Sequence, residues 1–328
     1  MTTDEFLALS ASTFDDVPQH AEALPGWDLS YAQMSRGRYA GTLAEARLKG
    51  IQLFRESTNS TSNQYGRGPR RSMIFGLPIG RSGDCKVNGT VLPPCGINVV
   101  RGDRGLDVTM PPSEFMVLAI EQDVLEDYLQ TMEQTSIQGW AEHGPLHIHC
   151  PELAAGVAAC LLEVHGELFG GLPALAETPW SLSAVRNHLL AQVAPVVAAN
   201  RQMARPLLAP FSRSQIVRKA REWIMDRLDE PLQVIDLCRE LRVSRRALQT
   251  SFQAVVGTGP ASYLRLLRLN GARHDLLACE DQSLQIKDVV ARWGFWHLSR
   301  FSGEYRQLFG ELPSETLRST RRSPPRRT

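Results

Sequence analysis

The sequence predicts an α+β protein, with a strand-rich N-terminal domain followed by an all-α C-terminal domain. Three observations predict this fold class: short apolar segments separated by turn residues from about Trp27 to Ile120, a change to helical spacing after Glu121, and an internal repeat of helices near the C-terminus. A chain of 328 residues is also long enough for two domains that each bury an apolar core.

The strand-rich region consists of short apolar segments, each bounded by turn residues. Such spacing is typical of an all-β sandwich or barrel. An Asn-Gly step at Asn88 and Gly89 lies between apolar neighbours, and it predicts a hairpin over Lys86–Val91. The segments are WDLSYAQMS, YAGTLAEARL, IQLFRES, RSMIFGLPIG, CKVNGTVLP, GINVVRG, LDVTMP and EFMVLAI.

Helical spacing begins after the last of these segments. It predicts one helix with Val124, Leu125, Tyr128, Leu129 and Met132 on the same face, and two more near residues 151–169 and 181–200. The segment RQMARPLLAPFS contains two prolines and predicts a linker. We therefore expect a first domain at 1–200, a linker at 201–212, a second domain at 213–320 and a disordered basic tail at 321–328.

The second domain contains an internal repeat. Both Gly257–Leu264 and Gly310–Leu317 read G-x-x-P-x-x-x-L, and the second lies 53 residues after the first. Leu248 and Phe252 map by the same offset onto Phe301 and Tyr305, so the preceding helices repeat as well. The sequence therefore predicts two copies of one small helical unit.

Each copy is predicted to be a helix, a tight turn and a second helix. The first copy runs from Val234–Leu241 through Arg242-Val243 to Ser244–Val255, and the second runs from Ile286–Trp293 through Gly294-Phe295 to a helix at about 297–308. Ser244 is a suitable N-cap, because its hydroxyl can accept a hydrogen bond from a backbone N–H of the first turn. Gly294 suits a turn with positive φ, whereas Arg242 at the matching place is expected to be strained.

The second helix of each copy has one apolar face and one hydrogen-bonding face. We expect Leu248, Phe252 and Val255 in the core of the first copy, and Phe301, Tyr305 and Leu308 in that of the second. The outer face of the first then carries Ser244, Arg245, Arg246, Gln249, Thr250 and Gln253, and that of the second carries His297, Ser299, Arg300, Ser302, Gly303 and Arg306.

These outer faces suit the major groove of double-stranded DNA. Arginine pairs with guanine and glutamine with adenine through two hydrogen bonds at the base edge. A solvated helix face is the alternative for any single helix, but duplication, capping and charge together favour DNA binding. Because its side chains are larger, the first copy is expected to discriminate more between sequences, and the second to rely on phosphate contacts and DNA shape.

An apolar-periodic run from Ala261 to about Leu277 joins the two copies. About 17 helical residues span roughly 25 Å, so such a helix can place two recognition helices in successive major grooves, about 34 Å apart. Arg265, Arg268 and Arg273 on this helix are either phosphate contacts or plain surface charges.

Charge and composition restrict the class of protein further. Residues 212–328 carry 21 Lys and Arg against 13 Asp and Glu, whereas the rest of the chain carries 15 against 22. A basic C-terminal part joined to an acidic N-terminal part indicates that only the former meets a polyanion. The sequence lacks a membrane-spanning run or a secretory signal, which predicts a cytoplasmic protein without membrane contact, and its six scattered cysteines are expected to be reduced.

The residues LCRELRVSRRALQTSFQAVVGTGPASYLRLLRLNGARHDLL and IKDVVARWGFWHLSRFSGEYRQLFGELPSETLR resemble the AraC/XylS family of bacterial transcription regulators. The GF…F…Y…FG..P pattern is specific to that family. By this resemblance, Arg246, Gln249 and Thr250 occupy base-reading places of the first unit, and Ser299, Arg300 and Gly303 those of the second. Arg242 and Val290 replace the glycine and alanine that are usual there.

The resemblance also implies an architecture and partners. It implies an N-terminal β-barrel, cupin-like sensor with dimerisation helices, and a homodimeric regulator, commonly an activator, that responds to a small-molecule effector and recruits RNA polymerase at promoter DNA. Candidate contacts for an anionic effector in the barrel are Tyr39, Arg47, Arg55 and Arg101.

The competing hypothesis is an enzyme in the N-terminal domain with an accessory DNA-binding region. His147-Ile-His149-Cys150 resembles a metal cluster, but no carboxylate or distant ligand completes it, and residues 27–120 contain no histidine. The sequence also lacks a G-x-S-x-G elbow and a P-loop. We therefore expect no catalytic residues, no metal and no cofactor.

Overall fold

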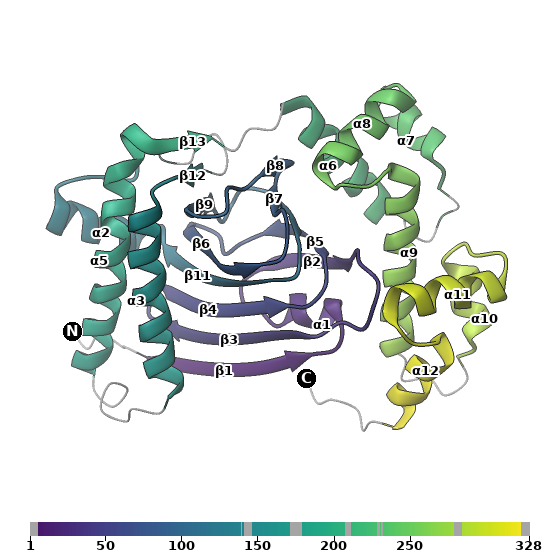
Figure 1. Cartoon of the computed structure of the whole chain (residues 1–328), viewed down its shortest axis with the longest axis horizontal. Helices are drawn as coiled ribbons and strands as arrows, with labels where there is room; N and C mark the ends of the chain where they lie inside the picture. The colour runs from purple at the N-terminus through teal and green to yellow at the C-terminus, as the bar shows by residue number, and fades with distance from the viewer. Residues whose placement is uncertain are drawn as a thin grey trace. The chain divides into compact units, whose positions relative to one another are not determined.

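The chain forms two compact units in a computed structural model, which describes residues 6–138, 140, 146–170, 179–206, 211–227, 230, 232–278 and 284–322 (Figure 1). Unit 1 consists of Met1–Ser30, Ala40–Asn59 and Gln64–Leu208. Unit 2 consists of Tyr31–Tyr39, Ser60–Asn63 and Ala209–Thr328. Unit 2 therefore includes two short segments from the N-terminal part of the sequence.

The larger sheet is built from eight antiparallel strands. The central strand β11 is buried along most of its length, which agrees with its nearly continuous apolar sequence EFMVLAI. In spatial order the strands are β1 (Leu7–Phe14), β3 (Gly41–Leu48), β4 (Ile51–Thr58), β11 (Ser113–Glu121), β6 (Ser72–Arg81), β9 (Ile97–Arg101), β12 (Leu146–Ile148) and β13 (Ala204–Pro206).

A smaller sheet has five strands, in the order β2 (Asp28–Gln33), β5 (Ser62–Arg67), β10 (Leu106–Met110), β7 (Lys86–Val87) and β8 (Thr90–Val91). The predicted hairpin is confirmed, because Lys86 pairs with Val91 across a two-residue turn. Asn88 and Gly89 in that turn have φ of 48° and 81°, and two positive φ values are what a type I′ turn requires.

The predicted β-barrel is wrong, because the described strands form two sheets that are not closed into one barrel. Alternation along a strand encodes which face is buried, but it does not encode which strand lies beside it. Pro111 and Pro112 lie between β10 of the smaller sheet and β11 of the larger one. Because proline has no N–H for a strand ladder, this step is a place where the chain leaves one sheet for the other.

Two long helices cover the larger sheet, as Figure 1 shows. They are α3 (Pro151–Phe169) and α5 (Pro179–Met203), and they match the helices predicted near 151–169 and 181–200. Val157 and Leu161 of α3 share one buried core with Leu189 of α5 and with Phe75 and Met116 of the sheet. Burial of this apolar area is the main force that holds helices and sheet together.

The described part of unit 1 also contains three short helical segments. They are α1 (Val17–Glu22), α2 (Gln122–Tyr128) and the π-helical turn η1 (Leu129–Glu133). Helix α2 and η1 together occupy the place of the helix that the sequence predicts after Glu121. Among the described residues, no helix is both long enough and apolar enough to span a membrane.

Parts of the predicted linker and of the predicted tail form regular secondary structure. Within the predicted linker, α5 continues to Met203 and Ala204–Pro206 forms β13, while residues 207–210 lie outside the described residues. Of the predicted tail, residues 323–328 also lie outside them. Strands β1 and β5 and helix α1 had no counterpart in the sequence prediction, and β5 begins with the polar run Ser62, Asn63 and Gln64, which lacks an apolar alternation.

The described residues of unit 2 form seven helices: α6 (Phe211–Met225), α7 (Val234–Glu240), α8 (Arg245–Val255), α9 (Pro260–Leu277), α10 (Ile286–Arg292), α11 (Leu298–Phe309) and α12 (Pro313–Arg322). They bury two separate apolar cores. Helix α9 contributes to both, with Tyr263 and Leu267 in the first core and Leu269 and Leu276 in the second. The predicted duplication is therefore also a duplication of cores on one shared helix.

The two N-terminal segments of unit 2 hold its helices through buried polar contacts. The Gln33 backbone N–H donates to Asn270 Oδ1 at 2.9 Å, and Asn270 Nδ2 donates to the Gln33 carbonyl at 3.2 Å. Arg221 Nη2 and the Tyr263 hydroxyl both donate to Asn63 Oδ1 at 3.0 Å. Such contacts join residues far apart in the sequence, and no local pattern predicts them.

Candidate nucleic-acid interface

The first helix-turn-helix unit comprises α7, a tight turn and α8. Arg242 in the turn has φ of 52°, the left-handed conformation expected there, and the Val243 N–H donates to the Cys238 carbonyl at 3.1 Å. Ser244 is the N-cap of α8, and its hydroxyl accepts a hydrogen bond from the Ala247 N–H at 3.1 Å. The predicted cap is confirmed, and it fixes the residue at which the recognition helix begins.

The second unit comprises α10, a turn and α11, and it repeats the same backbone pattern. Gly294 has φ of 70°, and the Phe295 N–H donates to the Val290 carbonyl at 2.9 Å. Val290, which stands where the resembled family usually has alanine, is buried in the second core. The core therefore has room for the larger side chain.

The two turns differ in length by one residue. Arg242 and Gly294 lie 52 residues apart, whereas the core residues Leu248 and Phe301 lie 53 residues apart. The extra residue lies between Phe295 and the N-cap His297, so it is Trp296. Its side chain is 91% exposed. The sequence prediction did not select this residue, although the change of offset between the two copies is visible in the sequence alone.

The two recognition helices turn their predicted apolar residues inward. Leu248, Phe252 and Val255 lie in the first core, and Phe301, Tyr305 and Leu308 in the second. All eleven residues predicted to face DNA are exposed, which gives each unit a solvent-facing polar surface. They are Ser244, Arg245, Arg246, Gln249, Thr250, Gln253, His297, Ser299, Arg300, Gly303 and Arg306.

The outer face of α8 keeps its positive charge available. Arg245 and Arg246 have no ion-pair partner among the residues that the structure describes. Gln253 Nε2 donates to the Gly257 carbonyl at 3.0 Å, so this amide is partly occupied by the turn that follows α8. Gln249 lies against Gly259, where an added Cβ would come within 2.8 Å of Gln249 Nε2. Glycine at that position leaves room for the Gln249 side chain.

The outer face of α11 includes a carboxylate that the sequence prediction missed. Glu304 accepts a hydrogen bond from Arg300 Nε at 3.1 Å and forms an ion pair with Arg265 of α9. Partial burial alone would raise the pKa of Glu304, but the hydrogen bonds from Arg265 and Arg300 hold it below its usual value. Glu304 therefore stays ionised and offsets part of the positive charge on this face. The i, i+4 spacing of Arg300 and Glu304 is the sequence signal that could have identified the pair.

The arginines of α9 are largely engaged inside unit 2. Arg273 is 8% exposed, and its Nη1 donates to Glu311 Oε1 at 2.6 Å, so this arginine is buried in an ion pair inside unit 2. Arg268 Nη2 donates to the Glu230 and Leu232 carbonyls at 3.0 and 3.2 Å. These hydrogen bonds help to hold α9 against the rest of unit 2.

The predicted effector contacts belong to both units. Tyr39 is buried in a segment of unit 2, whereas the three arginines belong to unit 1. Each arginine is paired with a carboxylate: Arg47 with Glu45, Arg55 with Glu114 and Arg101 with Asp103. None of them lines the pocket of about 660 Å³ that unit 1 contains.

The His147-Ile-His149-Cys150 segment has a structural partner. His147 is buried on β12, and its Nδ1 lies 2.9 Å from Asn98 Oδ1 on β9. The described part of the chain contains no group of three or more His, Cys, Asp or Glu side chains placed to hold a metal ion. Its five cysteines are free, and Cys279 lies outside the described residues.

Comparison with known proteins identifies the C-terminal region. A family model described as "Helix-turn-helix domain" matches residues 237–319. The chain is 42% identical over 104 residues to the probable thc operon regulatory protein of Rhodococcus erythropolis, which is 32% of this chain and 31% of that protein. It is 34% identical over 97 residues to XylDLEGF operon transcriptional activator 3 of Pseudomonas putida, which is 30% of this chain and 29% of that protein. The chain thus spans less than a third of the length of these relatives.

Among solved structures, the AraC-like transcriptional activator CuxR is similar with a TM-score of 0.43 and 16% sequence identity, over 81% of this chain and 96% of that one. The residues matched by the family model include most of the two units described above. Residues 237–319 of this chain are therefore a helix-turn-helix domain, and the predicted AraC/XylS resemblance is confirmed for this region.

Proposed function

We propose that the protein is a sequence-specific DNA-binding transcription regulator that acts in the cytoplasm as an activator and responds to a small-molecule effector. One observation carries the proposal: two helix-turn-helix units, each with its own core, present two recognition helices whose predicted DNA-facing residues are exposed. Names of relatives such as transcriptional activator and operon regulatory protein support the regulatory role and give no support to an enzyme.

The two recognition helices contribute to DNA binding in different ways. Arg246, Gln249 and Thr250 read base edges, because α8 presents long hydrogen-bonding side chains with free charge. The second helix carries smaller groups at Ser299 and Gly303, and Glu304 neutralises part of its charge. It therefore contributes mainly phosphate contacts and recognition of DNA shape, with Arg300 as its main hydrogen-bonding side chain.

Helix α9 sets the spacing between the two readers. Its 18 residues span about 27 Å, close to the distance of about 34 Å between successive major grooves on one face of DNA. Since α9 belongs to both cores, it fixes the two units to each other. One monomer then reads two adjacent segments of promoter DNA.

The remaining parts of the proposal concern unit 1. We assign residues 1–200 to effector sensing and dimerisation, 201–212 to a linker and 213–320 to DNA binding. Helices α3 and α5 form the homodimer contact, and the DNA-bound dimer recruits RNA polymerase. The family resemblance supports these roles, while the sensing role no longer depends on a closed barrel.

Selection of bound sequences from random DNA tests the function. The full chain is expected to enrich one motif with two contact blocks about ten base pairs apart. Against that motif, Arg246→Ala and Gln249→Ala are expected to relax base preference in one block at a cost of about 1–3 kcal/mol each. Arg306→Ala is expected to weaken specific and random DNA alike, because it contacts phosphate.

The control is Arg71→Ala, which removes an exposed arginine of unit 1 that pairs with Asp123. It is expected to leave DNA binding unchanged. Absence of any enriched motif would contradict sequence-specific binding. Equal losses on specific and random DNA for Arg246, Gln249 and Arg306 would contradict the division between base readers and phosphate contacts.

A further inference from the structure

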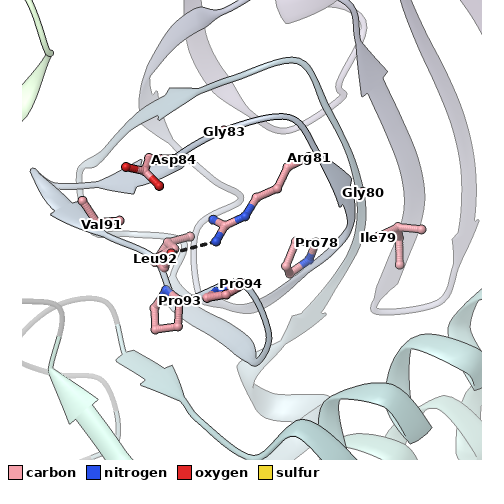
Figure 2. A pocket seen from close by; sticks show the side chains of 10 residues that line it. All are labelled: Pro78, Ile79, Gly80, Arg81, Gly83, Asp84, Val91, Leu92, Pro93 and Pro94. Carbon is pink, nitrogen blue, oxygen red and sulfur yellow. Dashed lines mark hydrogen bonds between the residues drawn. The ribbon is translucent and has the colours of Figure 1, made fainter.

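Unit 1 contains a pocket of about 660 Å³ between the end of β6 and the segments that flank the β7–β8 hairpin. Its apolar lining comes from Pro78, Ile79, Val91, Leu92, Pro93 and Pro94, and its charged lining from Arg81 and Asp84 (Figure 2). Small-molecule sites have volumes of about 300–1,000 Å³, mostly apolar walls and a few polar groups that fix orientation. The volume of this pocket falls in that range, its lining is polar and apolar in similar measure, and it is open to solvent on one side.

The guanidinium of Arg81 lies within the ring of lining residues, as Figure 2 shows. Its Nη2 donates to the Leu92 carbonyl at 2.9 Å, which holds the side chain in place. Its Nη1 is buried and has no hydrogen-bond partner in the part of the chain that the structure describes. A buried donor on a charged group that lacks an acceptor costs more than an ordinary unmade hydrogen bond, so an acceptor entering the pocket would be bound favourably.

Neither Arg81 nor Asp84 forms an ion pair with any residue that the structure describes. Leu92 of the pocket belongs to a small apolar core that includes Cys85 and Phe115. Burial raises the pKa of the Cys85 thiol to about 12, and the positive charge of Arg81 offsets part of this rise.

These features select the chemistry of the ligand. A carboxylate is the natural acceptor for Nη1, and the proline, isoleucine and leucine walls require an apolar body beside it. Asp84 on the same lining opposes a second negative charge, so a monoanion fits better than a dianion such as phosphate. A ligand that also carries an ammonium group would pair with Asp84.

We infer that this pocket binds a small organic carboxylate with an apolar body, with Arg81 as the contact for the carboxylate. The inference deepens the proposed function, because such a ligand would be the effector. The binding site itself can be tested without DNA. Failure of ligand binding and failure of DNA recognition are therefore separate results.

Calorimetric titration of the full chain tests the inference with four probes. They are 4-methylpentanoate, its amide, leucine and 3-methylbutylamine, which share one branched apolar body and differ in charge. At least one of the two carboxylates is expected to bind saturably, and at least about tenfold more tightly than the amide and the amine, since a charge-assisted hydrogen bond is lost in those two. Tighter binding of leucine would identify an amino acid as the ligand class, and tighter binding of 4-methylpentanoate a simple acid.

Substitutions of pocket residues then test whether the ligand binds in this pocket. Arg81→Gln is expected to weaken the bound carboxylate about tenfold or more, whereas the control Arg71→Gln, an exposed arginine of the same unit, is expected to bind like the unmodified chain. Asp84→Asn is expected to weaken leucine selectively. No saturable binding of either carboxylate, equal binding of acid and amide, or equal binding by Arg81→Gln would each overturn the inference. The comparison of acid with amide uses the unmodified chain, so it decides the question even if Arg81→Gln does not fold.

Discussion

Trp296 is the residue that distinguishes the two recognition turns. It occupies the extra position of the second turn, directly before the N-cap of α11, and 91% of its side chain is exposed. Leu298 beside it is 48% exposed. A large aromatic side chain in this place contributes nothing to the core, but under the proposed function it lies at the end of the helix that approaches the DNA. We therefore expect it to contact DNA through its ring and its indole N–H.

Trp296→Ala is expected to leave the thermal stability unchanged within about 0.5 kcal/mol, because the side chain is exposed. It is expected to weaken binding to the selected DNA motif by about 1–2 kcal/mol, or roughly five- to thirtyfold. Fluorescence anisotropy with labelled DNA measures the effect. Trp296→Phe serves as the control, since it keeps the apolar ring, and unchanged affinity of the alanine variant would exclude Trp296 from the interface.

Arg242 stores strain in the first turn. Its φ of 52° lies in the left-handed region, which costs a residue with a Cβ about 1–2 kcal/mol. Arg242→Gly is expected to raise the free energy of unfolding by up to about 1 kcal/mol, because glycine adopts this conformation freely but loses more entropy on folding. Arg242→Val is expected to lower it by about 1–2 kcal/mol, since a β-branched residue fits this region poorly. Urea denaturation of the two variants should give opposite signs, and equal signs would argue against strain at this position.

At the scale of elements, the second unit depends on a close contact between α9 and the end of α10. An added Cβ at Gly271 would lie 2.1 Å from Cη2 of Trp293, so glycine is required for the indole ring to pack there. The Trp293 ring is fixed in turn, because its Nε1 donates to Asp275 Oδ2 at 2.9 Å. This contact explains why α9, which contributes to both cores of unit 2, contains a glycine in its middle.

Gly271→Ala is expected to lower the free energy of unfolding, because overpacking of about 1–3 kcal/mol exceeds the gain in helix propensity of about 1 kcal/mol. The matched control is Gly303→Ala on α11, where an added Cβ meets nothing within 4 Å. This control is expected to stabilise the chain by about 0.5–1 kcal/mol. Differential scanning calorimetry compares the two, and a stabilising Gly271→Ala would contradict the packing described for Trp293.

At the scale of the whole molecule, unit 2 is completed by residues that precede it by more than a hundred positions. Asn63 accepts hydrogen bonds from Arg221 of α6 and Tyr263 of α9, and all three side chains are buried. Arg221 Nε also donates to the Tyr263 hydroxyl at 2.7 Å. Removal of a buried acceptor from a charged donor is costly, because the donor has no water to replace it.

Asn63→Ala is expected to lower the local stability of α6 and α9 by about 2–3 kcal/mol, which raises their amide exchange rates roughly 30- to 150-fold. Hydrogen–deuterium exchange measured by mass spectrometry resolves these helices from α11 and α12, where the effect is expected to be small. Asn63→Asp keeps the acceptor oxygens and is expected to retain most of the protection. Equal exchange in the alanine variant and the unmodified chain would show that the contact does not stabilise unit 2.

The sequence by itself determined the two recognition units almost to the residue. Apolar spacing, the N-cap at Ser244, the turn glycine Gly294 and the repeated G-x-x-P motif are all local signals, and local signals fix helix ends and faces. The same holds for the Asn88-Gly89 hairpin, whose turn type follows from two residues. These features need no knowledge of the rest of the chain.

Only the tertiary structure decided the features that depend on partners distant in the sequence. Alternating strands did not reveal two open sheets, since alternation does not specify neighbours. Burial of Arg273 beside Glu311, the pairing of Glu304 with Arg265 and the unpaired Nη1 of Arg81 depend on which side chains meet in space. A charged residue looks the same in sequence whether it is paired, buried or free, and its role is therefore decided by the fold.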